Sequence, residues 1–391
     1  MRFPTPYSEA NTVAYWDAIR AGNPTHVRMT FAAQDIVLTE ADIDIDTGIT
    51  IDDAFNADDV ISIGKVVCKK FSANIIITSR LANFKWVDRF KLEFGVEINS
   101  VTKWIVFGFF NGQVPKKTDN GSLVEYIAYD DMYRMDVPKT KEFMNSVPVV
   151  NGVVFLGDLF NYICNYTGIK TGTHQWGSAC LKSDLKEFKT LKEIVERIAE
   201  RFGYYIICDN TGTCVLTWFG SRNRYNFDDP VYLTIDCTDE FALKYQEIYN
   251  QSGYTWEEFC TRPWSAYTET TWEFITGFIT DNTITDVEVI IDDEIEDYTD
   301  SHLWNRVYYY ITDNVFTRGQ AFVADNIYNK LHELGNLSPL EVECIGNWML
   351  EAGDYVDVKI TADTTIRVPI FFRTFHWGAS CTDLIEVGTT V

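Results

Sequence analysis

The chain has 391 residues, a length that suits about two to four modules rather than one small core. Hydrophobic residues make up 46% and aromatic residues 15% of it, which excludes a disordered acidic tail. The formal net charge of −24 argues against a protein that holds nucleic-acid phosphates on a basic surface. It does not argue against passage of DNA, because an acidic wall repels a negative polymer.

The N-terminus, MRFPTPYSEANTVAYW, has no signal-peptide hydrophobic region, and no apolar run approaches the ~20 residues that span a bilayer. We therefore expect the chain to have no membrane-spanning segment and to fold in the cytoplasm where it is made. The nine cysteines are scattered without CxxC spacing. They predict reduced thiols that serve as small apolar residues.

The first predicted element is a short helix over residues 7–20, which stops at AGNP. It could reach a neighbouring subunit or pack on its own domain. From Val27 to Pro138, apolar and polar residues alternate in short runs, mostly bounded by Gly, Asn, Asp or Pro. This pattern predicts five or six closely spaced strands, as in a barrel or sandwich.

The pattern of apolar residues changes after Pro138 from alternation to helical spacing. VVFLGDLFNYICNYTGI has helical spacing, and TLKEIVERIAERFG predicts a helix that begins with a capping box of Thr190 and Glu193 and stops at Gly203. YYIICDNTGTCVLTWF follows as two strands around a turn. These features indicate a small α/β unit over residues 145–222.

From Val231 the strand patterns return in VYLTIDCT, ALKYQEIYNQ, WEFITGFI and DVEVIID. A helix is predicted in GQAFVADNIYNKLHELGN, and strands and turns occupy the rest. Residues 103–131 and 365–388 share an apolar strand, a glycine turn and an outgoing strand with a polar end. This faint repeat suggests two similar β-domains, one on each side of the α/β unit.

Two acidic motifs suggest chemistry, and we assign a structural role to both. Asp130 and Asp131 would point to opposite faces of a strand, so we expect a solvated strand end that leads into a linker. DIDIDTG, residues 42–48, approaches a calcium loop but holds Thr47 where glycine is required. The alternation of Ile43 and Ile45 favours a half-buried strand instead.

The remaining residue chemistry favours a protein that is not an enzyme. The histidines are scattered, and the sequence contains no P-loop, GxGxxG or GxSxG motif. We expect no metal and no cofactor. Acids and aromatic residues in a β-rich chain leave one alternative open, a carbohydrate-binding or glycan-degrading protein.

Several stretches, taken in order, resemble the baseplate or tail-tip hub proteins of tailed bacteriophages. These are the structural N-terminal part of the tail-associated lysin and its contractile-tail counterpart. This chain has Trp348 at a position where such proteins more usually have proline. Asp130 and Asp131 look like the boundary between the first barrel and the inserted domain. The stretches that carry the resemblance are YWDAIRAGNP, DIVLTEADIDIDTGITID, IGKVVCKKFSANII, SLVEYIAYDDMYRMD, TLKEIVERIAERFGYYIICDNTGTCVLTWF, DNVFTRGQAFVADNIYNKL and CIGNWMLEAGDYVDVKI.

The resemblance implies a mainly β protein with an α+β insertion. An N-terminal helix or arm (1–23) would precede a first tube-type β-barrel (24–137) and an inserted α/β domain (138–228). A second tube-type β-barrel (229–391) would be interrupted by a helix-containing accessory region (about 253–340).

The resemblance also implies a function in the virion tail, after assembly in the host cytoplasm. Three subunits with two barrels each would make a six-fold-like ring that closes the tail tube. The implied partners are the distal tail or tail tube protein, the tape-measure protein, and receptor-binding, fibre or spike proteins, with DNA only in transit. A bacteriocin or secretion-like injection device would share this fold. We expect no wall-degrading domain before Val391.

Acidic runs without Lys or Arg, at residues 35–59 and 292–300, are usually solvated faces, and they also suit the wall of a channel for a polyanion. From charge alone, the acids predicted to face the lumen are Asp42, Asp44, Asp46, Asp292, Asp293 and Glu294.

Overall fold

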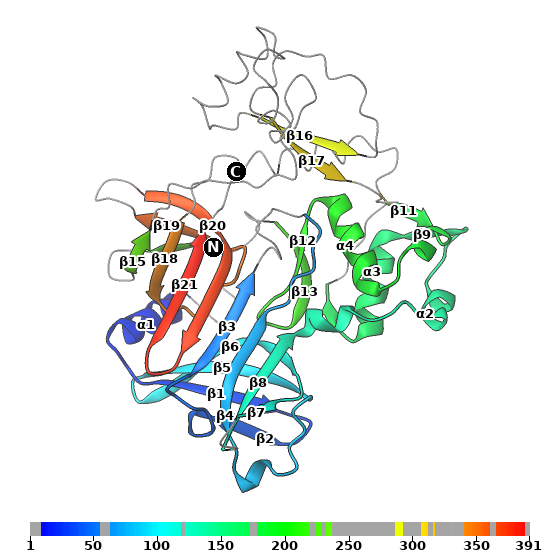
Figure 1. The fold of residues 1–391 in the computed structure, drawn as a ribbon. Helices are drawn as coiled ribbons and strands as arrows, with labels where there is room; N and C mark the ends of the chain where they lie inside the picture. Colours follow the sequence, from blue (N-terminus) through cyan, green and yellow to red (C-terminus); the bar gives the residue numbers. More distant parts are fainter. Residues whose placement is uncertain are drawn as a thin grey trace, which may run out of the picture.

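Figure 1 shows the fold in a computed structural model of the chain. The strands expected in ALKYQEIYNQ and WEFITGFI, and all but Lys330 of the helix expected in GQAFVADNIYNKLHELGN, lie outside the described residues. The structure describes residues 9–54, 63–118, 122–172, 178–218, 224–227, 232–236, 286–291, 306–311, 316, 330, 340–359 and 365–387.

The predicted N-terminal helix is confirmed as α1 (Glu9–Arg20). It packs on its own chain, because Tyr15, Ala18 and Ile19 are buried in the same core as the neighbouring strands. The ring of Tyr15 meets the ring of Trp348 edge-on, with 5.3 Å between centroids. Trp348 lies in a turn, as the sequence suggested, but its side chain is part of the core.

The alternating segment after α1 forms strands, as predicted. Their burial alternates residue by residue, as in β1 and β4, so one face of the sheet is buried and the other is partly exposed. The strands are β1 (Thr25–Phe31), β2 (Ile36–Thr39), β3 (Ile49–Ala54), β4 (Lys70–Ile76), β5 (Arg89–Ile98), β6 (Val101–Gly112), β7 (Lys116–Lys117) and β8 (Leu123–Asp130).

The late strands join this same sheet. In Figure 1 the red strand β20 lies beside the blue strand β3, and the two pair antiparallel with Phe375 opposite Ile51. The sheet runs in the order β15-β18-β21-β20-β3-β4-β8-β6-β5-β1-β2, with β7, β14 and β19 attached. The late strands are β14 (Arg224–Phe227), β15 (Tyr232–Asp236), β18 (Leu340–Ile345), β19 (Tyr355–Lys359), β20 (Thr365–Trp377) and β21 (Cys381–Val387).

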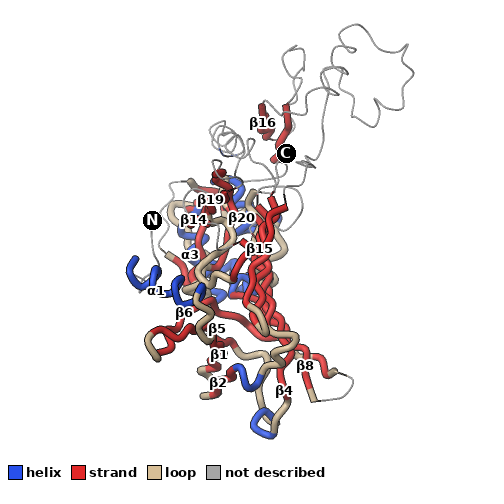
Figure 2. The backbone as a smooth tube through the Cα atoms, turned by 90° about the vertical axis from the view of Figure 1, so that its left-hand side faces the viewer, coloured by secondary structure: helices blue, strands red, loops and turns tan. Residues whose placement is uncertain are grey.

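This topology confirms a mainly β protein with one large sheet and short helices. Figure 2 shows the strands of both ends of the chain gathered in one block, with α1 at its side. Two separate barrels are not confirmed, since the first and last segments share a sheet. The two segments of the faint repeat do contain paired strands: β20 pairs with β21 along most of its length, but β6 pairs with β8 over only three residues.

The two helices and the pair of strands predicted within residues 145–222 also form. The long helix of this α/β unit begins at a capping box of Thr190 and Glu193 and ends at Gly203, which has a left-handed φ of 65°. The apolar side chains of the unit build a second core, separate from that of the large sheet. The elements are α2 (Lys141–Ser146), β9 (Val153–Phe155), α3 (Leu156–Thr167), β10 (Lys170–Thr171), β11 (Ala179–Leu181), α4 (Leu191–Phe202), β12 (Tyr205–Cys208) and β13 (Thr213–Thr217).

Smaller elements complete the description. The predicted strand DVEVIID appears as β16 (Asp286–Ile291), which pairs in parallel with β17 (Arg306–Ile311). Short 3-10 helices occupy Glu40–Asp42, Ser79–Leu81, Asp131–Met135 and Asp184–Glu187. The cysteines of the described part are all free, as predicted. No helix in that part is long and apolar enough to cross a membrane.

The strand expected in DIDIDTG is wrong. Asp42 ends a 3-10 helix, and a turn over residues 45–47 leads into β3. Ile43 is buried, but Ile45 is 49% exposed, so the two do not share the environment that alternation implied. The physical reason is local: carboxylates of Asp42 and Asp44 hydrogen-bond nearby backbone and hydroxyl groups and favour the turn over an extended strand.

Candidate functional site

A buried lysine lies where strands from the early and late parts of the chain meet the α/β unit. Lys69, just before β4, is 5% exposed, and its Nζ is 3.3 Å from Oδ2 of Asp53 on β3. The same Nζ donates to Oε1 of Glu351 at 3.2 Å and to Oδ1 of Asn210 at 3.1 Å. Asn210 belongs to the turn between β12 and β13, and Glu351 to the segment between β18 and β19. One ammonium group therefore contacts three distant parts of the chain.

The acids around Lys69 also hold backbone groups in place. Oε1 of Glu351 accepts a hydrogen bond from the backbone N–H of Asn210 at 2.7 Å, and Oδ2 of Asp53 accepts one from Ala352 at 3.0 Å. The N–H of Glu351 donates to Oδ2 of Asp354 at 2.9 Å. Because charged acceptors make stronger hydrogen bonds than neutral ones, this network fixes the turn of residues 346–354 against the sheet and the α/β unit.

A second buried ion pair, between Arg373 and Asp383, also contacts this turn. Arg373 on β20 donates from Nε to Oδ1 of Asp383 at 2.6 Å and from Nη2 to Oδ2 at 3.0 Å. Arg373 also donates to the carbonyl oxygens of Leu350 and Asn347. Asp383 accepts from the N–H of Asn347 at 2.6 Å. The turn lies inside the protein, and the pair supplies its backbone groups with the hydrogen bonds that water would otherwise make.

Asp130 and Asp131 are buried, so the expected solvated strand end is wrong. Oδ1 of Asp130 accepts from the N–H of Met132 at 3.0 Å, whereas Oδ2 is buried and has no hydrogen-bond partner among the described residues. Burial raises the pKa of Asp130 to about 8; Lys69 opposes this shift and Asp53 adds to it. The carboxyl is therefore largely protonated at neutral pH.

Asp131 has a different role, as the partner of a cation. Nε of Arg89 donates to its Oδ1 at 2.8 Å, and Nδ2 of Asn111 donates to the same atom at 3.0 Å. Neither acid is open to a sugar ring, and they stand where β8 passes into the 3-10 helix that precedes the α/β unit. Sequence reasoning missed their burial because Arg89 and Asn111 are distant in the chain.

The acids predicted to face a lumen have unequal surroundings. Asp42 is 7% exposed and pairs with Arg80. Asp44 is half-buried and accepts from Oγ1 of Thr47 at 3.0 Å, whereas Asp46 is exposed. Asp292, Asp293 and Glu294 lie outside the described residues. Across the part of the chain that the structure describes, no group of His, Cys, Asp or Glu is arranged to hold a metal ion.

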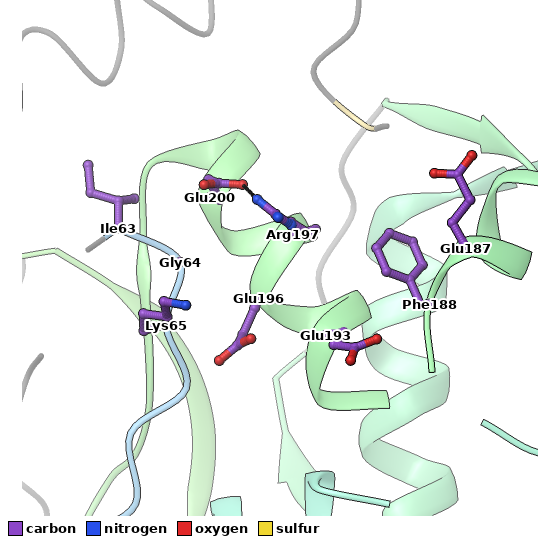
Figure 3. Close-up of a pocket in the computed structure, with 9 residues that line it drawn as sticks. All are labelled: Ile63, Gly64, Lys65, Glu187, Phe188, Glu193, Glu196, Arg197 and Glu200. Atoms are coloured by element: carbon purple, nitrogen blue, oxygen red, sulfur yellow. Dashed lines mark hydrogen bonds and ion pairs between the residues drawn. The ribbon is translucent and has the colours of Figure 1, made fainter. Parts of the chain in front are cut away.

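A groove of about 410 Å³ lies between α4 and the segment that precedes β4, and Figure 3 shows its lining. Three of its four acids, Glu193, Glu196 and Glu200, have partners within the protein. Glu196 accepts from the N–H of Val66 at 3.2 Å, Glu193 caps its own helix, and Arg197 donates to Glu200 at 2.8 Å. We therefore regard the groove as part of the contact between the segment and α4. The lining residues are Ile63, Gly64, Lys65, Glu187, Phe188, Glu193, Glu196, Arg197 and Glu200.

No protein-family model matches this chain, and no curated protein sequence does. Solved structures do match it. The 43 kDa tail protein of prophage MuSo2 from Shewanella oneidensis is 12% identical, with a TM-score of 0.50, and the match covers 93% of this chain and 98% of that one. The tail protein from Neisseria meningitidis MC58 is 10% identical, with a TM-score of 0.51, and the match covers 93% of this chain and 96% of that one.

These matches establish a shared fold. The chain has the fold of prophage tail proteins along nearly its whole length. At the level of the fold, they confirm the resemblance that the order of motifs suggested in the sequence.

Proposed function

We propose that this chain is a structural hub of a phage tail tip or baseplate. Three copies would form a ring that closes the distal end of the tail tube and leaves a channel for the tape-measure protein and then for DNA. The observation that carries the proposal is the match to two prophage tail proteins over 98% and 96% of their lengths. Because the match covers 93% of this chain as well, the likeness extends over nearly all of both chains and not over one widespread module.

The large sheet suits a wall along which another polymer passes. Its inner face holds the aromatic core, whereas its outer face is polar and partly exposed. Charges on the outer face are balanced locally, as where Lys70 lies 3.5 Å from Asp52 with both side chains more than 40% exposed. One row of cross-strand neighbours on this face is Thr374, Asp52, Lys70, Tyr129, Asn111 and Arg89.

The division into two tube-type units is part of the proposal. The pairing of β3 with β20 sets strands of residues 24–137 beside strands of residues 229–391. Each subunit would then contribute two similar groups of strands to a ring. Three subunits would meet a six-fold tube with six such groups. We keep the proposed boundaries 1–23, 24–137, 138–228 and 229–391 on this basis.

The role is mechanical rather than catalytic. The acids that most suggested catalysis, Asp130 and Asp131, are buried in structural contacts. The proposed partners are the tail tube above and the fibre or spike proteins below, in the tail of the virion. In this proposal Asp44 and Asp46, together with Asp292, Asp293 and Glu294, face the lumen, and Asp42 contributes less because Arg80 neutralises it.

An antibody against the purified chain tests the location directly. Applied to particles from cells that produce the protein, it should label the end of the tail distal to the capsid, in negative-stain micrographs. Label on capsids, or on no particle although the protein is in the lysate, would contradict the proposal.

A charge exchange tests the lumen. Replacing Asp44 and Asp46 with Lys should leave assembly intact and slow DNA ejection, because cations along a channel attract phosphates. The control variant replaces Asp17 and Asp158, exposed acids on α1 and α3, with Lys. Equal ejection rates in both variants would remove Asp44 and Asp46 from the channel wall.

A further inference from the structure

Lys69 and Asn210 bring an amine and a carboxamide together inside the protein. Nζ of Lys69 is 3.1 Å from Oδ1 of Asn210, although the residues are 141 positions apart. Lys69 is 5% exposed, and Asn210 is half-buried, so bulk water has little access to the amine. A carboxylate is also present, since Oε1 of Glu351 is 3.2 Å from Nζ. A nucleophile, an acyl group and a proton acceptor therefore share one site.

We propose that Lys69 and Asn210 condense spontaneously in the folded protein to form an isopeptide bond between Nζ and Cγ. The bond is a modification of the chain by its own residues and goes beyond the hub function, on which it does not depend. It would join the segment before β4 covalently to the turn between β12 and β13.

The reaction balances without an outside reagent. Glu351 takes a proton from the Lys69 ammonium, and the neutral amine attacks Cγ of Asn210. The tetrahedral intermediate collapses with breakage of the Cγ–Nδ2 bond. Glu351 returns the first proton to the departing nitrogen, which leaves as ammonia and takes the second proton of the attacking nitrogen to become an ammonium ion. One ammonium and one carboxamide thus become a secondary amide and an ammonium ion, with the same total charge on both sides. No oxidant, metal or cofactor takes part.

The geometry assigns a role to each neighbour. Glu351 touches the reacting amine and also fixes the acyl partner, because the same oxygen accepts from the backbone N–H of Asn210 at 2.7 Å. It is therefore the general base and then the general acid. Asp53, 3.3 Å from Nζ, is a positioning residue whose own place is set by the N–H of Ala352. Rotation of the Asn210 amide about its Cβ–Cγ bond would turn the face of the carbonyl group toward the amine.

Proximity accelerates a reaction that is very slow between free side chains. Well-oriented intramolecular partners reach effective concentrations of about 10⁵–10⁸ M. The turn that carries Asn210 is itself rigid, since Asp209 Oδ1 accepts from the N–H groups of Thr211 and Thr213 at 2.9 Å each. Burial of the Lys69 amine limits the access of water to the bond that forms.

The first experiment is the intact mass of the full purified chain under denaturing conditions. Loss of one ammonia predicts a mass about 17 Da below that of the sequence, after allowance for removal of Met1. A tryptic digest should contain one branched peptide in which the segment with Lys69 is joined to the segment with Asn210. Trypsin does not cleave at an acylated lysine, so Lys69 should also be a missed site.

Variants then assign the chemistry. Glu351→Gln removes the base and should restore the full sequence mass, as should Lys69→Arg, which removes the amine, and Asn210→Ala, which removes the acyl group. The matched control is Glu125→Gln, which alters an exposed acid on β8 and should keep the loss of ammonia. Rescue of bond formation in Glu351→Asp, at a slower rate, would identify a proton-transfer role that a packing role would not give.

Two results would overturn the inference. One is a wild-type mass equal to that of the sequence with only linear peptides, which remains decisive even if the variants fail to fold. The other is a loss of about 17 Da with only linear peptides, since a backbone succinimide at an asparagine gives the same mass change. Hydroxylamine opens a succinimide and leaves an isopeptide bond intact, so the two products are distinguishable.

Discussion

Nε of Arg373 and Oδ1 of Asp383 lie 2.6 Å apart, and both side chains are completely buried. A second bond from the same guanidinium and two backbone carbonyl oxygens complete its surroundings. A buried pair of this kind does not add much stability over apolar residues, but breaking it leaves a charge without a partner. The turn of residues 346–354 should therefore be sensitive to a substitution that removes one partner of this pair.

Arg373→Met should lower the free energy of unfolding by about 3–5 kcal/mol, because Asp383 would stay buried without its cation. The control is Arg367→Met on the same strand. Arg367 pairs with Asp357 at 3.0 Å but is 51% exposed, and its loss should cost about 0–1 kcal/mol. Urea unfolding followed by tryptophan fluorescence measures both. Equal small losses would show that the buried pair does not hold the turn.

The parts of the fold that follow from local signals were predictable from the sequence. Helix α4 is an example, because its capping box, its apolar spacing and Gly203 all lie within the helix or beside it. The alternation in β1 and β4 gave strands with one buried face for the same reason. The order of several such elements was enough to suggest the tail-protein fold.

Long-range pairing was not predictable. Nothing local to β3 shows that its neighbour is β20, with Ile51 opposite Phe375. The candidate site depends on the same pairing, since Lys69 meets Glu351 only after the two ends of the chain share a sheet. Asp130 and Asp131 looked like surface acids because acids usually are, and the residues that surround them come from other strands and from distant turns.

The protonated state of Asp130 predicts a pH dependence of stability. Its folded pKa of about 8 lies above the ~3.9 of an unfolded aspartate. The folded state therefore binds the proton more tightly, and its contribution to stability is lost as pH rises from about 4 to about 8. Above pH 8 the loss is complete and no further change arises from this group.

Asp130→Asn should remove this fall in stability between about pH 4 and about pH 8. The variant should gain stability relative to wild type at pH 8, by on the order of a few kcal/mol, and gain nothing at pH 4, where both forms are neutral. Thermal melting across this range measures the difference. Glu125→Gln, an exposed change on the same strand, should run parallel to wild type. A constant offset between Asp130→Asn and wild type at all pH values would refute the assigned protonation.

Gly112 should not tolerate a side chain. A Cβ there would lie 1.9 Å from the carbonyl oxygen of Trp86 and 2.0 Å from the hydroxyl of Tyr126. These two groups share a hydrogen bond of 2.7 Å that passes over the glycine. Gly112→Ala should therefore cost about 1–3 kcal/mol and lower the melting temperature. A Cβ at Gly172 would have no neighbouring atom within 4 Å, so Gly172→Ala should change stability by no more than about 0.5 kcal/mol.

The mass of the purified protein in solution tests whether the proposed hub is a trimer. Light scattering on a sizing column should give three times the 45.0 kDa of one chain, and micrographs of that peak should show a ring with a central hole. A single species of 45.0 kDa at every concentration, with no ring in the presence of tail tube protein, would contradict the account.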